Sequence, residues 1–241
     1  MKLYTEGPED KALDIYSPEG MRILADLWVK TYLHNKLTHD ITWLGRPIIQ
    51  FPEDVIMMQE LIWAERPDAI VETGIAHGGS AVFHASMLEL LGRGEVYAVD
   101  IDIRAHNRVE IEKHPQFSRI HLFEGSSVDQ SVFDTVAAAV RAGGHERPLV
   151  VLDSCHSRDH VRREMELYGE LVPVGSYMVV MDGVQRDVWD IPRGKPEWRE
   201  DHPLAAIEAF LADHPGQWEV DERYTRLLVT TNPRGFLRRV A

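Results

Sequence analysis

Val71-Glu-Thr-Gly-Ile-Ala-His-Gly-Gly-Ser80 is the stretch of sequence that decides the fold. It joins an apolar run to the start of a predicted helix and places an acidic residue and three glycines at the junction. Glycine lets backbone amides approach a ligand and a helix N-terminus attracts anions, so the junction predicts a nucleoside cofactor site. Its spacing, Glu-x-Gly-x-x-x-Gly-Gly, differs from the Gly-x-Gly-x-x-Gly of dinucleotide binders. S-adenosylmethionine is therefore favoured over NAD.

Beyond this junction, short apolar runs alternate with amphipathic stretches, a pattern typical of a doubly wound sheet. Strands are predicted at 68–73, 95–100, 119–124, 148–153 and 176–182, and helices at 80–91, 104–113, 130–141, 158–171 and 203–212. Two last β candidates, 218–224 and 227–231, have no helix between them and are predicted to pair antiparallel. The predicted fold class is α/β: a doubly wound, mostly parallel Rossmann-like sheet of about seven strands with a final antiparallel pair, plus an N-terminal helical cap.

The N-terminal part follows a different pattern, with helical spacing of apolar residues over 18–37 and again over 53–65. The segment 39–48 between them is predicted to be a loop or lid. We interpret both helices as packing against the sheet or another subunit, because apolar stripes usually mean core. The predicted organisation is a helical cap or lid region at 1–66 and a cofactor-binding domain at 67–241, within one structural unit.

Composition restricts the classes of partner. The chain has 241 residues, 44% of them apolar, and a formal net charge of -13. This charge argues against nucleic acid or an anionic membrane surface, and we expect a small-molecule substrate and a homo-oligomer. The N-terminus does not resemble a signal peptide and no apolar run is long enough to span a bilayer, so a cytoplasmic location is predicted. The single cysteine, Cys155, excludes intramolecular disulfides and is interpreted as a small buried filler.

Polar residues at the predicted strand ends are the candidate cofactor ligands. Asp100 ends the second strand about twenty residues past the glycine turn, where a carboxylate can accept both ribose hydroxyls of an adenosine. The alternative is that Asp100 and Asp102 cap the next helix. Ser126 and Ser127 could reach the adenine edge, although capping explains Ser127 equally well. The predicted cofactor-binding residues are Glu72, Gly74, Gly78, Gly79, Ser80, Asp100, Ser126, Ser127 and Asp153.

The ends of the fourth and fifth strands carry the candidate chemistry. Asp153 and Asp182 would face one crevice, where two carboxylates suit magnesium or a similar divalent cation. His156 lies three residues past Asp153 and can accept a proton from a substrate hydroxyl at neutral pH. An alternative is a two-histidine, one-carboxylate iron site formed by His156, His160 and Asp153, which would indicate oxygen chemistry. Ordinary capping or ion pairing of the carboxylates is a further alternative.

Several segments resemble the cephalosporin hydroxylase family: Trp43-Leu-Gly through Pro52-Glu-Asp, Arg66-Pro-Asp-Ala-Ile-Val-Glu-Thr-Gly with Gly78-Gly-Ser80, Leu152-Asp-Ser-Cys-His156-Ser, and Thr231-Asn-Pro-Arg-Gly-Phe-Leu-Arg-Arg-Val240. The resemblance covers roughly residues 43 to 240. It implies the fold of class I S-adenosylmethionine-dependent methyltransferases and a relation to macrolide-sugar O-methyltransferases, which use magnesium and a histidine base at an Asp-x-x-His motif.

Carried over, the resemblance implies Asp153 as a metal ligand and His156 as the base. The family often has a Glu-Asp pair at the end of the fifth strand, and here that pair is Met181-Asp182, so one carboxylate is missing. The predicted function is an O-methyltransferase acting on a hydroxyl of a sugar or of a glycosylated or polyketide-type natural product. The alternatives are the iron oxygenase and an inactive S-adenosylmethionine-binding partner protein. The loop 185–202, with Trp189, Arg193, Trp198 and Arg199, is the expected substrate wall.

Overall fold

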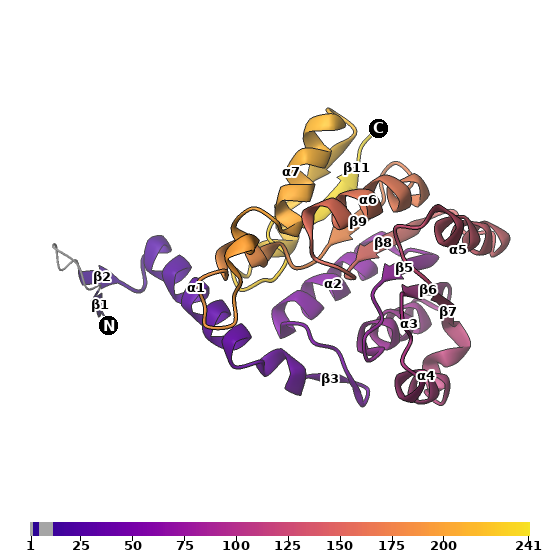
Figure 1. Cartoon of the computed structure of the whole chain (residues 1–241), viewed down its shortest axis with the longest axis horizontal. Helices are drawn as coiled ribbons and strands as arrows, with labels where there is room; N and C mark the ends of the chain where they lie inside the picture. The colour runs from indigo at the N-terminus through magenta and orange to yellow at the C-terminus, as the bar shows by residue number, and fades with distance from the viewer. Residues whose placement is uncertain (1, 5–11) are drawn as a thin grey trace.

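A seven-stranded sheet organises the chain (Figure 1). The computed structural model describes residues 2–4 and 12–241. The sheet order is β10-β11-β9-β8-β5-β6-β7, in which β5 to β9 are parallel and β11 runs antiparallel to both of its neighbours. The strands are β5 Ala69–Thr73, β6 Glu95–Asp100, β7 Ile120–Glu124, β8 Pro148–Leu152, β9 Tyr177–Val180, β10 Trp218–Val220 and β11 Phe236–Arg239. The predicted α/β sheet and its five parallel strands are confirmed.

Helices cover both faces of the sheet, so the strands are apolar on both sides. On one face of the sheet, Ile70 of β5 packs in an apolar cluster with residues of α2, α3 and α4. On the other face, Val71 packs in a second cluster with residues of α5, α6 and α7. The helices are α2 Pro52–Glu65, α3 Gly79–Leu91, α4 Ala105–Glu112, α5 Gln130–Ala142, α6 Arg158–Tyr168 and α7 Pro203–Asp213. Because α2 shares its cluster with α3, it is part of the main core.

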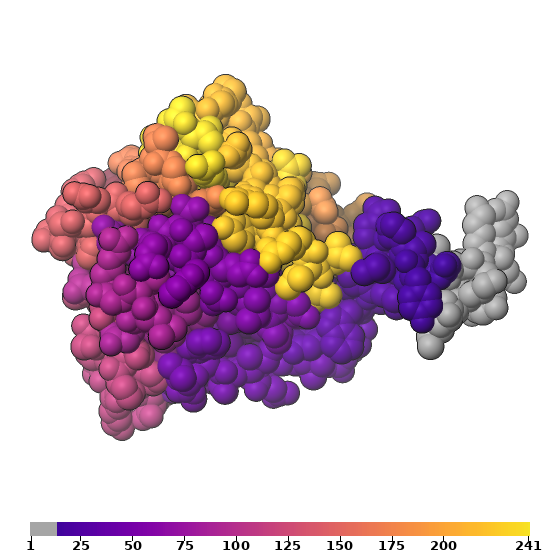
Figure 2. All heavy atoms as spheres, turned by 180° about the vertical axis from the view of Figure 1, so that it is seen from behind, coloured from indigo at the N-terminus to yellow at the C-terminus, as the bar shows by residue number. Residues whose placement is uncertain are grey.

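The N-terminal segment lies outside the main sheet; its first part extends away from the core, and its last part, a short β-hairpin, packs on α3. It comprises the paired strands β1 Lys2–Tyr4 and β2 Ala12–Asp14, helix α1 Pro18–His34, the 3-10 helix η1 Leu37–Asp40, and the short hairpin β3 Thr42–Trp43 and β4 Arg46–Pro47. The start of α1 projects from the body of the molecule (Figure 2). Only its Val29 side joins a small cluster with Phe51, Val184 and Val188. The predicted boundary at residue 66 stays a prediction.

Among the described residues, no helix combines the length and apolarity needed to cross a membrane.

The last predicted strand is in the wrong place. Residues 227–231 are irregular, and the strand is Phe236–Arg239, which lies between β9 and β10. Phe236 packs in one core cluster and Leu237 in the other, as expected for an interior strand. Apolar side chains at 227–229 suggested a strand, but residues 230–231 are held by side-chain contacts described below. The turn Asn232-Pro-Arg-Gly235 was the available signal that the strand begins later.

The glycines of the junction are required mainly by packing against the protein itself. A Cβ on Gly79 would lie 2.1 Å from the carbonyl oxygen of Pro47, and one on Gly74 would lie 2.0 Å from that of Asp153. Gly74 also has a φ of +90°, which favours glycine. The sequence prediction attributed these glycines to ligand approach, whereas here they let β4 and the β8 loop lie directly on the turn.

Replacing Gly79 with alanine is expected to destabilise the fold by about 3 kcal/mol, because backbone must move at the β4 contact. Urea denaturation measures this loss. Gly216→Ala is the matched control, since no described atom lies within 4 Å of its Cβ position and only the φ of +75° opposes the change. That strain costs about 1 kcal/mol. Equal losses in the two variants would contradict the packing role of Gly79.

Candidate functional site

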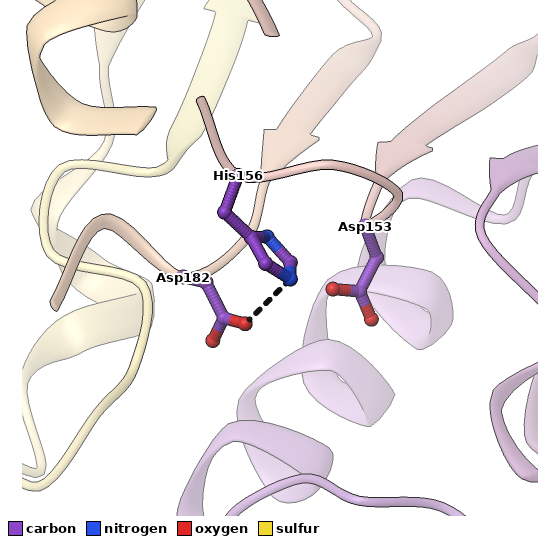
Figure 3. Close-up of side chains that lie close together, drawn as sticks. All are labelled: Asp153, His156 and Asp182. Carbon is purple, nitrogen blue, oxygen red and sulfur yellow. Dashed lines mark ion pairs between the residues drawn. The ribbon is translucent and has the colours of Figure 1, made fainter. Parts of the chain in front are cut away.

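Three side chains from neighbouring strand ends converge at one edge of the sheet. Asp153 and His156 follow β8, and Asp182 follows β9, so the parallel strands deliver all three to the same edge. One ligand atom from each lies within 4.8 Å of the others. His156 Nε2 is 3.3 Å from Asp182 Oδ2, and the three side chains point toward one another (Figure 3). The sequence prediction placed these residues in one crevice, and the structure brings them together.

The backbone at Asp182 has an unusual conformation. Its φ of 58° lies in the left-handed region, which aspartate and asparagine tolerate better than most residues. The Asp182 amide donates to Oδ1 of Asn232 at 3.0 Å, and Asn232 is buried. Asn232 therefore fixes the turn that directs the Asp182 carboxylate into the site. Sequence reasoning missed this role, although Asn232 stands in one of the segments that carries the family resemblance.

A buried carboxylate on α2 holds the segment that contains Asn232. Asp54 is 2% exposed and accepts hydrogen bonds from the Thr230 hydroxyl, from the Thr231 amide at 2.8 Å and from the Thr231 hydroxyl at 2.9 Å. The Thr231 hydroxyl is also 3.0 Å from Asn232 Oδ1. These contacts link α2 to Asp182 through the C-terminal segment. They also explain why residues 230–231 do not form the predicted strand.

Burial raises the pKa of Asp54 from 3.8 to about 6, against the opposing effect of its hydrogen bonds and with a further rise from the charge of Asp182. A raised carboxyl pKa contributes stability that is full below the unfolded value, near 3.8, and is lost as the pH rises through about 6. The shift corresponds to about 3 kcal/mol. We expect the free energy of unfolding to fall by about this much more for the native protein than for Asp54→Asn between roughly pH 4 and pH 7.

Denaturant unfolding across this pH range measures the difference. Asp26→Asn is the matched control, because Asp26 is exposed on α1. Its pH profile should follow that of the native protein. Parallel profiles for the native protein and Asp54→Asn would contradict the assignment of this pH dependence to Asp54.

The surroundings of Asp153 oppose the ionised form of its carboxyl group. Its pKa is raised well above the ordinary value, first by desolvation and then by the charges of Asp182 and Glu72, while a hydrogen bond from Gln50 acts in the opposite direction. Gln50 is buried beside the site and was not among the predicted residues. Carboxylates held together at this energetic cost are a common feature of functional sites, and a bound cation would relieve their repulsion.

A cavity of about 410 Å³ lies between the glycine turn, the end of β6 and the start of α6. It is lined by five of the predicted cofactor residues: Gly74, Asp100, Ser126, Ser127 and Asp153. Asp100 Oδ2 accepts from the amides of Ile75 at 2.8 Å and Ala76 at 3.2 Å. Asp100 therefore ties the turn to β6 as well as facing the cavity, which is a structural role that the sequence did not reveal.

Two further side chains hold the glycine turn from outside. The buried Asn107 of α4 donates to the Ala76 carbonyl at 2.8 Å, and Arg46 Nε of β4 donates to the His77 carbonyl at 3.0 Å. Arg46 also approaches Asn107 Oδ1 at 3.3 Å. Neither residue was predicted, because a polar residue in a helix or hairpin gives no sequence signal for a contact that depends on tertiary structure. Together they fix the carbonyl groups of the turn while its amides face Asp100.

Glu72 takes a position unlike that of the other predicted cofactor residues. It is fully buried in β5, with Oε2 3.6 Å from His84 Nδ1. It lines neither the cavity of about 410 Å³ nor the smaller cavity beside Asp153, His156 and Asp182. Neither carboxylate oxygen accepts a hydrogen bond from the described residues.

Gly78, Gly79 and Ser80 lie at the start of α3, and of these Gly79 and Ser80 line the second cavity, of about 190 Å³, with Asp153, His156 and Asp182.

The two-histidine iron site is not formed. His160 Nε2 lies 3.1 Å from the Ser127 hydroxyl and 3.2 Å from the Ser154 hydroxyl, and Ser154 donates to the buried Glu164 at 2.7 Å. The cluster with Asp153 and His156 takes Asp182 as its third member. His160 therefore belongs to the wall of the cavity of about 410 Å³, called the cofactor cavity below after the role proposed for it. The interpretation of Cys155 as a buried filler is also wrong, because its thiol is exposed on the loop after β8.

Met181 occupies the position where the resemblance implied a second acidic ligand. Its side chain is 3% exposed and packs in the apolar cluster that includes α2 and α3. The residue thus contributes to the core next to the site, with no ligand atom in the cluster of Asp153, His156 and Asp182. Among the described residues, Asp153, His156 and Asp182 are therefore the side chains that could bind a cation at this position.

A third cavity, of about 270 Å³, opens beside Asp182 and joins η1 to the loop after β9. We name it the acceptor cavity, after the role proposed for it below. Its lining residues are Leu33, Lys36, Thr38, His39, Ile49, Asp182, Val184, Gln185, Val188, Ile191, Arg193, Trp198 and Thr231. Of the four loop residues expected to form a substrate wall, Arg193 and Trp198 line it. Trp189 lies on a different groove, with Arg199 stacked 4.7 Å above its ring.

Comparison with known proteins identifies the family. A family model described as Rhamnosyl O-methyltransferase/CmcI matches residues 35–240. Rhamnosyl O-methyltransferase of Mycobacterium tuberculosis is 30% identical over 225 residues, covering 89% of this chain and 84% of that protein. The Mycobacterium leprae protein of the same name is 29% identical over 228 residues, with coverages of 92% and 93%.

Solved structures support the same fold. An apo-structure of CmcI superimposes with a TM-score of 0.61 at 21% identity, covering 84% of this chain and 77% of that chain. An O-methyltransferase from Bacillus cereus gives a TM-score of 0.51 at 15% identity, with coverages of 86% and 84%. The family model spans most of the sequence, which confirms the resemblance inferred from the motifs. The chain belongs to the Rhamnosyl O-methyltransferase/CmcI family.

Proposed function

We propose that the protein transfers a methyl group from S-adenosylmethionine to a hydroxyl group of a sugar or glycosylated small molecule, with a divalent cation at Asp153 and Asp182 and with His156 as the base. The observation that carries the proposal is the position of these three side chains, which lie between the cofactor cavity and the acceptor cavity. The coarser class, an S-adenosylmethionine-dependent O-methyltransferase, is confirmed by the family and by the curated relatives.

The cofactor cavity suits S-adenosylmethionine. Its volume of about 410 Å³ lies within the usual range of small-molecule sites, and Asp100, Ser126 and Ser127 supply polar groups on one side. Asp153 lies at the boundary with the second cavity, where the reactive end of the cofactor would be. A CmcI structure of the same fold contains Mg and SAM, the two groups that the residues of this chain predict. When bound, the cofactor supplies an electrophilic methyl group.

The residues of the cluster fit a hard divalent cation. Two carboxylates converge, the pKa of one is raised by the charge of the other, and Asn232 fixes the backbone of the second. Oxygen donors of this type are the usual ligands of magnesium. Asp153 and Asp182 would hold the ion, which when bound polarises a hydroxyl oxygen and lowers its pKa. With Met181 in the core, two protein carboxylates are available and water would complete the coordination.

His156 is positioned to take the hydroxyl proton. Its side chain is 30% exposed and faces the cavity that it shares with Asp153 and Asp182. After the proton moves to His156, the resulting imidazolium lies beside the Asp182 carboxylate, 3.3 Å away, and this contact stabilises the charge. The alkoxide character of the acceptor and the positive charge of the sulfonium both diminish as the methyl group moves. The protein thus mainly needs to align the reactants and exclude water.

The proposed homo-oligomer has a candidate surface on α1. Met21, Leu24, Leu27 and Trp28 are exposed on this helix, between 38% and 51%. Large apolar side chains gathered on one exposed helix are typical of contact surfaces. A second copy of the chain is the partner proposed here, and the measured molar mass in solution tests it. A cytoplasmic location also stays a prediction.

Titration calorimetry and labelled methyl transfer test the function. We expect micromolar binding of S-adenosylmethionine or S-adenosylhomocysteine, and methyl transfer to members of a panel of glycosides in the presence of magnesium. NAD is the control ligand, and no binding is expected. Binding of NAD without binding of either S-adenosyl compound would refute the cofactor assignment. Oxygen uptake with ferrous iron but no methyl transfer would instead favour the oxygenase.

A further inference from the structure

The acceptor cavity gathers positive charge in a strongly acidic protein. The chain has a formal net charge of -13, yet the cationic side chains of Lys36 and Arg193 line this one cavity, with His39 beside them. They come from two segments distant in sequence: the start of η1, and the loop that follows β9. This loop returns over the carboxyl end of the sheet and places Arg193 opposite η1. The concentration of cations is therefore created by the tertiary fold.

Among the described residues, neither Lys36 nor Arg193 forms an ion pair with a carboxylate, whereas Lys30, which does not line the cavity, pairs with Asp190 at 2.7 Å. Cationic surroundings also affect His39: desolvation lowers its pKa first, followed by the charges of Lys36, His77 and Arg193, while Asp40 partly opposes them. A carboxylate does line the cavity, at Asp182, but it belongs to the proposed cation site.

The remaining lining suits the body of a small ring compound. Ile49, Val184, Val188 and Ile191 provide apolar surface, and Trp198 provides an aromatic face. The volume of about 270 Å³ fits one or two sugar-sized units. Asp182 lines both this cavity and the cavity of His156, so a ligand here can present a hydroxyl to the cluster. Its other substituents would then face η1 and the loop 185–202.

We propose that the methyl acceptor is anionic, and that Lys36 and Arg193 bind a carboxylate or phosphate group on it while its reacting hydroxyl lies at Asp182 and His156. This assignment rests on the proposed methyl transfer and adds the charge class of its substrate. Arginine offers paired N–H donors to an oxyanion and lysine offers a compact charge, so together they recognise the group by charge and geometry. A neutral sugar would leave both cations without a partner.

The test compares ligands that share one ring and differ only at C6. Methyl β-D-glucoside, methyl β-D-glucuronide and methyl β-D-glucoside 6-phosphate are titrated calorimetrically into the full-length protein with S-adenosylhomocysteine and magnesium present. We expect at least one anionic ligand to bind roughly tenfold more tightly than the neutral one, because one charge-assisted contact has about this effect. The two anions distinguish a carboxylate from a phosphate preference. Equal affinities for all three ligands, or no binding by any at millimolar concentration, overturn the proposal.

Variants test whether Lys36 and Arg193 are responsible for the preference for an anionic ligand. Arg193→Gln and Lys36→Gln should each reduce the preference for the anionic ligand roughly fivefold or more while leaving its neutral analogue and S-adenosylhomocysteine unaffected. Lys30→Gln is the matched control, because it removes a lysine that already has a partner outside the cavity. An equal loss in Lys30→Gln overturns the assignment to Lys36 and Arg193. Failure of S-adenosylhomocysteine to bind counts against the proposed function, whereas normal cofactor binding without an anion preference counts against this inference alone.

Discussion

His156→Ala is expected to reduce turnover roughly a hundred- to ten-thousand-fold, the range over which general bases contribute to catalysis. The imidazole lies between the two carboxylates of the cluster, and no other described histidine belongs to that cluster. Affinity for S-adenosylhomocysteine should be unchanged, because His156 lines the cavity of the cluster and is absent from the wall of the cofactor cavity. Single-turnover methyl transfer and calorimetry separate these two effects.

A second histidine variant serves as the control. His106→Ala is the matched control, since His106 is exposed on α4 away from the cluster. It should retain native turnover. Native turnover in His156→Ala would remove His156 as the base and would favour a mechanism in which another group accepts the proton.

Asp153→Asn is expected to have two opposite effects. It should weaken magnesium binding and reduce turnover by at least about a hundredfold, because a Lewis acid contributes several kcal/mol to such a reaction. It should also raise the thermal stability of the metal-free protein. The reason is electrostatic: desolvation and the charges of Asp182 and Glu72 raise the pKa of Asp153, so its ionised form is held at a cost in the folded state.

Thermal unfolding with and without magnesium measures both effects. The native protein should gain stability on addition of the ion, whereas Asp153→Asn should begin from a higher melting temperature and gain little. Asp159→Asn is the control, because Asp159 is exposed in the first turn of α6 and, within the described part of the chain, forms an ion pair with Arg158 alone. It should behave as the native protein does. Magnesium stabilisation that is unaffected by Asp153→Asn would show that the ion binds elsewhere.

The parallel strands were predictable because each is a short apolar run that ends at a polar or glycine-rich turn. Residues 69–73 and 148–152 are buried, and the apolar runs at 69–71 and 148–152 were sufficient to place these strands. The strand at 236–239 was not found because half of it is charged. Arg238 is opposite Glu219 on the paired strand, and such a partner is not visible in a local pattern.

The candidate metal ligands could be predicted from the topology of the sheet, whereas the residues that hold their backbone in place could not. Asp153 and Asp182 end adjacent parallel strands, so one rule of α/β sheets places them together. Asn232 and Asp54 act through contacts that cross 50 and 177 positions of sequence, at Asp182 and Thr231 respectively. Polar residues of this kind have no characteristic spacing. Only the folded chain shows which backbone groups they hold.

The arrangement of the cavities has a consequence for evolution. The acceptor cavity and the cofactor cavity have no lining residue in common among the described residues, and the acceptor cavity meets the cavity of the catalytic cluster at Ile49 and Asp182. Substitutions in η1 or in the loop after β9 can therefore change which molecule is methylated without altering donor recognition. This separation would let descendants of one ancestral enzyme acquire new substrates through a few exchanges in two short segments.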